Sequence, residues 1–182
     1  MMDRHLRKVY YISSDIAIII LLWIILTVTE EILGCPDHCY CTDSISDCRH
    51  KHFTVFPSSD ITGPVLNLYF QFNNITHIDI ITQTSRVLNI LDLSHNPIHK
   101  ISSYAFANIG IKHLKLNNCS LSSLSAVTFL GRLMQRSLTT LELSYNTVDM
   151  KLPDGLLTGI NLNEVKMINS RLSSVSFLYG TS

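Results

Sequence analysis

The sequence predicts a repeat solenoid of the α/β class, a horseshoe in which short parallel strands line a concave face and loops or short helical turns cover the convex face. Three features of the 182 residues predict it. A short apolar pattern recurs at a nearly constant interval, a tight group of cysteines precedes its first copy, and an apolar leader precedes the cysteines. A leucine- and isoleucine-rich pattern of this kind suits a stacked core.

The clearest copy of the pattern spans residues 88–98 and reads L-x-x-L-x-L-x-x-N-x-I. Its separations of three and then two residues fit neither a long helix nor a plain strand. They fit a coil in which a short strand exposes alternate residues and then bends sharply. Leu91 and Leu93 are expected to point inward and Asp92 outward. We expect the side-chain amide of Asn96 to turn toward backbone groups that the bend leaves unpaired.

The same slots are filled five times, which makes the pattern strong. Its polar slot lies at residues 73, 96, 119, 146 and 170, so the spacings are 23, 23, 27 and 24 residues. The chain here resembles the extracellular leucine-rich-repeat proteins, whose period is about 20 to 29 residues. The five units cover roughly residues 65–175 and fill the slots with Val65, Leu68, Phe70, Asn73 and Ile75; Leu88, Leu91, Leu93, Asn96 and Ile98; Ile111, Leu114, Leu116, Cys119 and Leu121; Leu138, Leu141, Leu143, Asn146 and Val148; Leu162, Val165, Met167, Ser170 and Leu172.

Four cysteines, Cys35, Cys39, Cys41 and Cys48, stand between the leader and the first repeat with the spacing C-x3-C-x-C-x6-C. Cysteines this close oxidise in an oxidising compartment, and a solenoid needs an atypical unit to cover its apolar end. Sequence alone allows three connectivities. The stretch resembles the cysteine-rich N-terminal flank of extracellular leucine-rich-repeat proteins, the LRRNT-type cap. That resemblance implies the pairs Cys35–Cys41 and Cys39–Cys48.

Zinc ligation is the alternative use of these cysteines, because His38, His50 and His52 lie close by in the sequence. The export signal and the absence of a C-x2-C pair count against it. We therefore predict no metal site.

An apolar run over residues 16–28, interrupted only by Thr27, follows a segment with three basic residues. Its length matches the core of a signal peptide and falls short of the roughly 20 residues needed to span a bilayer. Cleavage after Thr29 or Gly34 is predicted, with an uncleaved signal anchor as the alternative. The expected location is secreted or on the extracellular face of the plasma membrane.

Composition and motifs exclude several classes of function. The 14 basic and 14 acidic residues give a net charge of zero, which argues against nucleic acid as a partner. The sequence has no G-x-S-x-G, no H-E-x-x-H and no glycine-rich phosphate loop. We therefore predict no enzymatic activity and no cofactor.

These features divide the chain into a signal peptide over residues 1–34, a cysteine-rich cap over 35–62, about five repeats over 63–178 and a tail over 179–182. No second cysteine cluster or apolar run follows the repeats, so the last repeat is expected to expose its apolar face. The chain is therefore interpreted as truncated from a longer receptor or as a short secreted form. Membrane association would come from an uncleaved leader or a missing downstream anchor.

Apolar residues also recur eight positions after the last slot of a unit, at Phe106, Phe129 and Leu156. We expect them to pack the convex side against the strands. The first unit has Gln83 there, so Ile80 or Ile81 must fill the space. The extra residues 131–137 are interpreted as a solvated bulge on the convex side, and residues 53–57 as the last strand of the cap and its exit turn.

The concave face is the predicted site. Parallel strands stack about 4.8 Å apart, so equivalent positions form ladders across the sheet. The central ladder alternates in charge, and the simpler interpretation is a set of exposed ion pairs. The alternative is a protein-binding surface anchored by exposed aromatic residues. Its members are Tyr69, Phe72, Asp92, His95, Lys115, Glu142, Tyr145 and Lys166.

Two N-glycosylation sequons begin at Asn74 and Asn118. Cys119, the fifth cysteine, occupies the polar slot of the third unit. It is predicted to be a buried thiol, with a partner-linking disulfide as the alternative.

Export, cap, repeats and the lack of a catalytic motif favour an extracellular protein-binding module of the adhesion or receptor type, whose protein ligand or receptor is unknown. The alternative is a short secreted regulatory or decoy form, or a fragment without autonomous function.

Overall fold

The computed structural model describes residues 18–19, 34–61, 64–82, 87–124, 126–129, 131–146, 150 and 152–170. The chain separates into two compact units, residues 1–33 and 34–182. In the first unit only residues 18 and 19 are described, as helix. The rest of that unit, which holds most of the predicted signal segment, lies outside the described residues, as does the tail. Within the described ranges no helix has the length and apolar character needed to cross a membrane.

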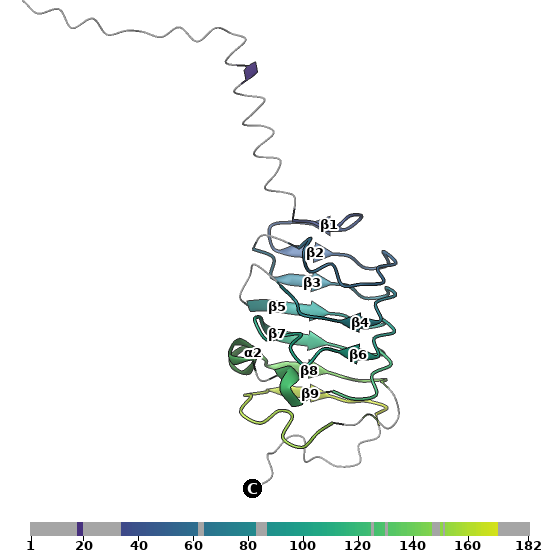
Figure 1. Cartoon of the computed structure of the whole chain (residues 1–182), viewed down its shortest axis with the longest axis vertical. Helices are drawn as coiled ribbons and strands as arrows, with labels where there is room; N and C mark the ends of the chain where they lie inside the picture. Colours follow the sequence, from purple (N-terminus) through teal and green to yellow (C-terminus); the bar gives the residue numbers. More distant parts are fainter. Residues whose placement is uncertain are drawn as a thin grey trace, which may run out of the picture. The chain divides into compact units, whose positions relative to one another are not determined.

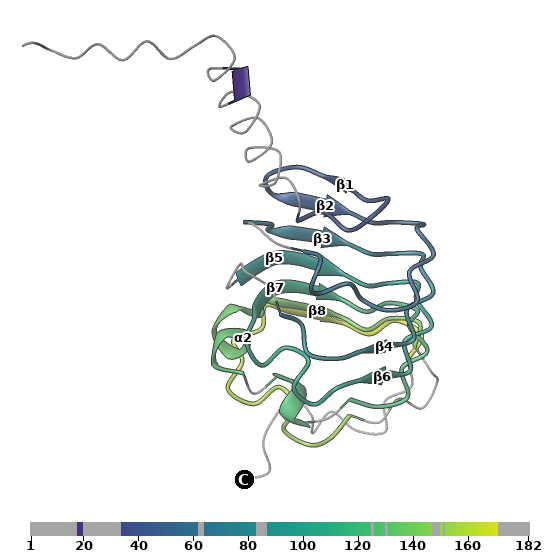
Figure 2. The same cartoon turned by 45° about the horizontal axis from the view of Figure 1, so that its top comes forward.

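The second unit is a stack of coils, each contributing one short strand to a seven-stranded sheet (Figure 1). All neighbours are parallel except β1 and β2, which form a hairpin. Two further strands, β4 (His77–Ile78) and β6 (Lys100–Ile101), pair in a separate parallel sheet (Figure 2). The strands of the larger sheet, in spatial order, are β1 (Tyr40–Cys41), β2 (Ile45–Asp47), β3 (Asn67–Tyr69), β5 (Val87–Asp92), β7 (Gly110–Lys115), β8 (Thr140–Glu142) and β9 (Glu164–Lys166).

The register of the larger sheet is the predicted one. The second apolar slot of each unit faces its equivalent in the next, in the order Leu68, Leu91, Leu114, Leu141 and Val165. The four leucines are fully buried, and Val165 is partly buried against the core. Because side chains alternate along a strand, this register turns the next residue of each strand to the opposite face of the sheet. This is the face that the sequence predicts to be concave, and we call it the outer face.

The convex slots are also confirmed. Phe106 and Phe129 are fully buried and stacked with ring centroids 6.3 Å apart, and Leu156 is buried beside the same core. In the first unit Ile81 is buried while Ile80 is 48% exposed. Ile81 therefore fills the space that the sequence left open between two isoleucines.

The polar slots form an inner turn column, which we define as Asn73, Asn96, Cys119, Asn146 and Ser170. Asn96 shows how it works: Nδ2 donates to Phe70 O and Leu93 O at 2.8 Å, and Oδ1 accepts the Ile75 N–H at 3.1 Å. One side chain thus satisfies backbone groups of two successive units, as the sequence predicts for a buried bend. Asn146 Nδ2 likewise donates to Leu116 O and Leu143 O.

Cys119 departs from this pattern because a thiol replaces the amide. It is free and fully buried, and its Sγ donates to Leu93 O at 3.3 Å. Burial raises the pKa of the thiol to about 12, although backbone groups of Asn96 and His95 oppose that rise. A buried, protonated thiol fits the prediction and gives no support to a disulfide with a partner.

The cap joins Cys35 to Cys41 and Cys39 to Cys48 by disulfides, which is the pairing implied by the resemblance. Its β2 strand pairs with β3, so the cap extends the sheet. The interpretation of residues 53–57 as a strand is wrong, because no strand forms there. The aromatic rings at Phe53 and Phe56 pack on Phe70 instead, at centroid distances of 5.7 and 4.8 Å.

The interpretation of residues 131–137 as a solvated bulge is also wrong. Arg132–Ser137 forms helix α2, which packs on β7 and buries Met134 completely in the core. Ser137 Oγ closes the helix by donating to Leu133 O at 2.7 Å. Only the two arginines of the segment behave as predicted and are exposed. A single-turn 3-10 helix, η1 (Ala126–Phe129), precedes α2.

Candidate interaction surface

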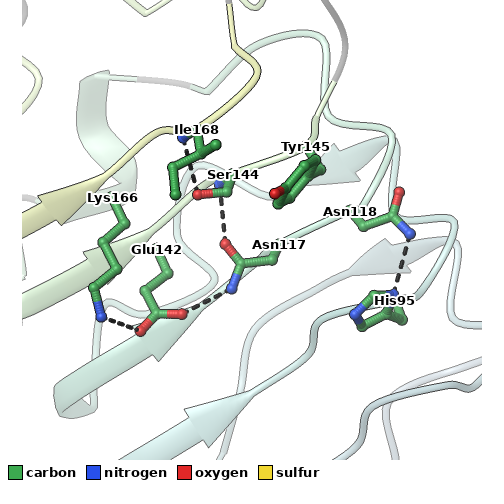
Figure 3. Close-up of a pocket in the computed structure, with 8 residues that line it drawn as sticks. All are labelled: His95, Asn117, Asn118, Glu142, Ser144, Tyr145, Lys166 and Ile168. Carbon is green, nitrogen blue, oxygen red and sulfur yellow. Dashed lines mark hydrogen bonds and ion pairs between the residues drawn. The ribbon is translucent and has the colours of Figure 1, made fainter.

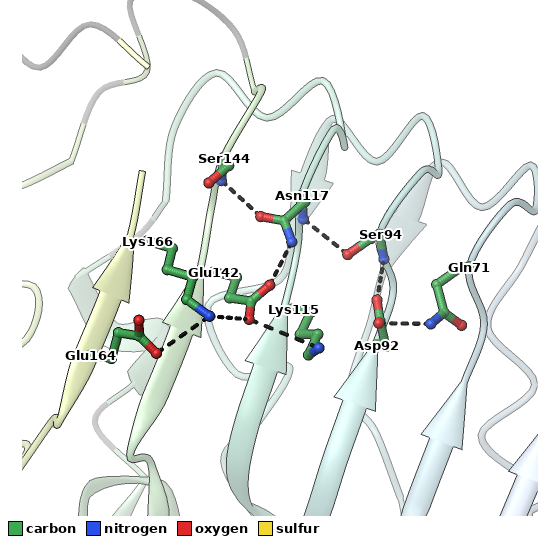
Figure 4. Close-up of polar contacts among 9 residues, drawn as sticks. All are labelled: Gln71, Asp92, Ser94, Lys115, Asn117, Glu142, Ser144, Glu164 and Lys166. Atoms are coloured by element: carbon green, nitrogen blue, oxygen red, sulfur yellow. Dashed lines mark hydrogen bonds and ion pairs between the residues drawn. The ribbon is translucent and has the colours of Figure 1, made fainter. Parts of the chain in front are cut away.

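Charged side chains cross the outer face of the sheet near β7, β8 and β9 (Figure 4). Lys166 Nζ lies 3.2 Å from Glu142 Oε1 and 3.4 Å from Glu164 Oε2. Lys115 Nζ lies 3.9 Å from the same Glu142 oxygen, and Asn117 Nδ2 donates to Glu142 Oε2 at 2.8 Å. The predicted ion pairs are therefore present between these three strands.

Glu142 is held as an anion by its neighbours. Partial burial alone would raise the pKa of this carboxyl, but the hydrogen bonds from Asn117 and Lys166 and the charge of Lys115 bring the pKa below its ordinary value. The same contact with Glu142 raises the pKa of Lys166. Near neutral pH both groups are charged and largely cancel, so Glu142 is suited to holding its neighbours in place and poorly suited to donating a proton.

Asp92 corrects the prediction that the central ladder is uniformly exposed. It takes its predicted place opposite Tyr69 and Lys115, yet only 7% of its surface is exposed. Gln71 Nε2 donates to Asp92 Oδ2 at 2.7 Å, and the Ser94 N–H donates to Asp92 Oδ1 at 3.0 Å. Asp92 therefore contributes to the structure of the sheet rather than to an exposed set of charges.

A second ladder runs along the bend: four of its members stand one residue before a member of the inner turn column, and His50 of the cap has the same backbone conformation. We define this outer turn column as His50, Phe72, His95, Asn118 and Tyr145. Their backbone N–H groups bond in series to the next unit, at the carbonyls of Gln71, Ser94, Asn117, Ser144 and Ile168. All five have φ between 51° and 59°, a region that residues other than glycine, asparagine, aspartate and histidine seldom adopt. The neighbouring units impose this conformation, which turns the five side chains outward.

Three rings of the outer turn column are stacked. The His50 and Phe72 ring centroids are 4.6 Å apart with planes 3° from parallel, and Phe72 and His95 are 4.4 Å apart at 12°. These distances match the spacing of about 4.8 Å between strands, so the backbone repeat sets the stacking. Phe72 is 48% exposed and Tyr145 is 52% exposed, so two large rings stand on this bend with about half of their surface in solvent.

A hollow of about 540 Å³ opens where the charged and aromatic ladders meet (Figure 3). Its rim is formed by His95, Asn118 and Tyr145 of the outer turn column. Asn118 Nδ2 donates to His95 Nδ1 at 3.1 Å, so the Asn118 side chain turns toward His95. Polar and apolar groups behind the rim complete the hollow, namely Asn117, Glu142, Ser144, Lys166 and Ile168.

The hollow brings together half of the predicted surface. His95, Glu142, Tyr145 and Lys166 line it, while Tyr69, Phe72, Asp92 and Lys115 do not. Tyr69 instead lies under the guanidinium of Arg49, whose Cζ is 5.8 Å from the ring centroid. The predicted surface thus consists of a stacked, ring-rich part near β3 and β5 and a hollowed part near β8 and β9.

Sequence reasoning missed Asn117, Ser144 and Ile168. They lie two residues before the inner turn column, at a position equivalent to Gln71 and Ser94. Ser144 Oγ accepts the Ile168 N–H at 3.0 Å, and Asn117 Oδ1 accepts the Ser144 N–H at 2.9 Å. The run of polar residues at this offset, Gln, Ser, Asn and Ser, is the signal that could have revealed them.

The two sequon asparagines lie in different surroundings. Asn74 and Asn118 are both exposed, but Asn118 lines the hollow while Asn74 follows the bend of the first unit. Glycosylation at either position stays a prediction.

Zinc ligation by the cap has no cysteine thiolates available, because all four of its cysteines are joined in disulfides. Among the described residues no three histidine, cysteine or carboxylate side chains are grouped to hold a metal ion.

The model of the family described as Leucine Rich Repeat matches residues 87–109. This segment contains β5, β6 and the convex Phe106, which together make one coil of the stack. The fold is thus a leucine-rich-repeat solenoid of about five turns. The match and the two disulfides fit a leucine-rich-repeat protein with a cysteine-rich flank. Such repeats typically form protein-interaction domains without enzymatic activity.

Proposed function

We propose that this chain is an extracellular protein-binding module of the adhesion or receptor type, and that its partner binds the outer face of the sheet. The observation that supports the surface is the outer turn column, where large rings are exposed on a backbone fixed by hydrogen bonds between units. Aromatic side chains held in place lose little conformational entropy on binding and are frequent anchors of protein interfaces.

The surface is tested by comparing exposed aromatic residues on two sides of the coil. Phe72→Ser combined with Tyr145→Ser removes two rings from the outer face, and Tyr104→Ser removes one that is 64% exposed in the connection between β6 and β7. The oxidised full chain is screened by surface plasmon resonance against purified cell-surface and secreted ectodomains. The partner found is then measured with each variant.

The double variant should bind at least about 30-fold more weakly, since an anchor residue contributes about 2 kcal/mol or more. Tyr104→Ser should bind like the unsubstituted chain. The proposed surface would be wrong if the double variant bound as tightly as the unsubstituted chain. It would also be wrong if Tyr104→Ser lost as much affinity as the double variant. Thermal melting of each variant separates lost binding from lost folding.

The extracellular location is part of the same proposal and rests on the two disulfides of the cap, which are typical of exported domains. The chain is expressed in cultured animal cells, and the medium and cell fractions are treated with an N-glycosidase. We expect the chain in the medium or on the cell surface, with a shift in mass that Thr76→Ala and Ser120→Ala abolish together. A cytosolic chain with reduced cysteines would contradict the location while leaving the binding surface untouched.

A further inference from the structure

The ladder of rings in the outer turn column is interrupted at Asn118. His50, Phe72 and His95 stack face to face, Asn118 follows in the next unit, and Tyr145 occupies the unit after that. Each step corresponds to one strand spacing, so two steps place the turn positions of His95 and Tyr145 about 9.6 Å apart. That distance accommodates one planar ring between two others.

The interruption coincides with the hollow. One face of the His95 ring stacks on Phe72, and His95 also lines the hollow beside Asn118 of the next unit (Figure 3). Tyr145 is on the far side of Asn118 and is 52% exposed. Asn118 bends toward His95 Nδ1, and its short side chain spans less of the gap than a ring would.

The charges in the hollow favour a neutral occupant. Glu142 is paired with Lys166 and Lys115 and accepts a hydrogen bond from Asn117. An added cation would meet the two ammonium groups, and an added anion would meet the Glu142 carboxylate. Ile168, which is 57% exposed, adds an apolar wall. A neutral planar group with a polar edge meets none of these penalties.

We infer that the hollow takes one neutral aromatic side chain, of the tyrosine or tryptophan kind, from the protein partner. The inserted ring continues the ladder between His95 and Tyr145 above Asn118. This inference rests on the proposed protein-binding function and names the chemistry of the partner's anchor. An N-glycan on Asn118 would stand in the same place and compete with that anchor.

Two substitutions at Asn118 isolate the gap. Asn118→Phe fills it with a ring belonging to the chain, and Asn118→Gly leaves it open. Both remove the sequon and the hydrogen bond to His95, and both suit the backbone, because φ is 51° at Asn118 and rings already stand at φ 58° and 59° at Phe72 and Tyr145. The two variants therefore differ in whether the gap is filled. The reference is the full chain with Ser120→Ala, which keeps Asn118 and removes its glycan.

Three probes are used: N-acetyltryptophanamide, N-acetylleucinamide and N-acetylargininamide. Their binding to each variant is measured by saturation-transfer NMR. We expect the tryptophan amide to bind the reference and the glycine variant about tenfold more tightly than the leucine amide, because stacking on two rings adds about this factor. It should also bind more tightly than the arginine amide. Asn118→Phe should weaken binding of the tryptophan amide about tenfold.

Equal binding of the leucine and tryptophan amides, or tighter binding of the arginine amide, would overturn the inference. So would unchanged binding to Asn118→Phe. If thermal melting shows that Asn118→Phe does not fold, Tyr145→Ala takes its place. This variant should weaken binding of the tryptophan amide about threefold, because one of the two stacks is lost. Unchanged binding to Tyr145→Ala would equally overturn the inference. Failure of these tests leaves the protein-binding proposal standing if the Phe72 and Tyr145 double variant still loses its partner.

Discussion

Asparagine stands in both turn columns, one residue apart, with opposite surroundings. In the inner turn column Asn96 and Asn146 are 1% and 7% exposed, and their Nδ2 groups donate to backbone carbonyls of two units. In the outer turn column Asn118 is exposed at φ 51° and points at a neighbouring ring. The backbone conformation, not the residue type, assigns the role. Neighbouring residues in each bend therefore differ in role: one is buried and bonds the units together, and the other is exposed on the outer face.

The largest effect is expected at Leu93, a fully buried core slot three residues before Asn96. Leu93→Asp should abolish folding, because an unpaired charge in the core is very costly. Asp92→Ala should cost about 1–3 kcal/mol, since it leaves Gln71 Nε2 and the Ser94 N–H without their acceptor. Secretion yield and thermal melting measure both. Similar melting temperatures for the two variants would contradict the register.

Asn96→Ala and His95→Ala compare the two columns directly. Loss of the Asn96 amide leaves the Ile75 N–H without its acceptor and takes one of two donors from each of Phe70 O and Leu93 O, at an expected cost of about 2 kcal/mol. His95→Ala removes an exposed ring and should cost less than about 1 kcal/mol. Urea unfolding of both variants checks the difference. The division into columns fails if His95→Ala is the more damaging change.

Cys119→Asn asks whether the inner turn column prefers its usual residue. Asn146 Oδ1 accepts the N–H groups of Cys119 and Leu121, and the new Oδ1 would stand in the same relation to Asn96 and Ile98. We expect a gain of about 1 kcal/mol in the free energy of unfolding. Cys119→Ala is the control and should not stabilise the protein. A loss with Cys119→Asn would mean that the site is shaped for sulfur.

The smallest effect is expected at Glu142, whose pKa is lowered from its ordinary value of 4.5. A carboxyl with a lowered folded-state pKa stabilises the protein above its unfolded-state pKa and loses that contribution as the pH falls through the folded-state pKa. Glu142→Gln should therefore lower stability by up to about 1 kcal/mol at neutral pH, and by progressively less as the pH falls through the folded-state pKa. Melting curves across this range test it, with Glu164→Gln as the exposed control. A difference in stability between Glu142→Gln and the unsubstituted protein that grows toward acid pH would contradict the prediction.

The periodicity of the sequence was sufficient to predict the five repeat strands β3, β5, β7, β8 and β9, their register and the buried leucines, because each depends on spacing alone. It was also sufficient for the role of Asn96, since a bend leaves backbone groups that a side-chain amide satisfies. It was insufficient for Asp92, where alternation gives the direction of the side chain but not the Gln71 amide that covers it. Met134 was missed because its helix belongs to one unit and does not repeat.

Only half of the residues predicted for the candidate surface line the hollow, because the sequence does not show contacts between units. Rings such as Tyr145 were recognised by residue type, whereas the hollow depends on Asn117 and Ser144, which are common surface residues. Their role follows from hydrogen bonds between units that only the three-dimensional stack brings together.

The side-chain amide protons of asparagine test the division into two turn columns most directly, because the same chemical group can be read in both. Hydrogen exchange of these protons is followed by NMR in the folded, oxidised chain. The Nδ2 protons of Asn96 and Asn146, which are buried and bonded to carbonyls, should be strongly protected. Those of Asn118, which is exposed in the outer turn column, should exchange at rates close to those of an unfolded chain. Equal rates at Asn96 and Asn118 would contradict the account.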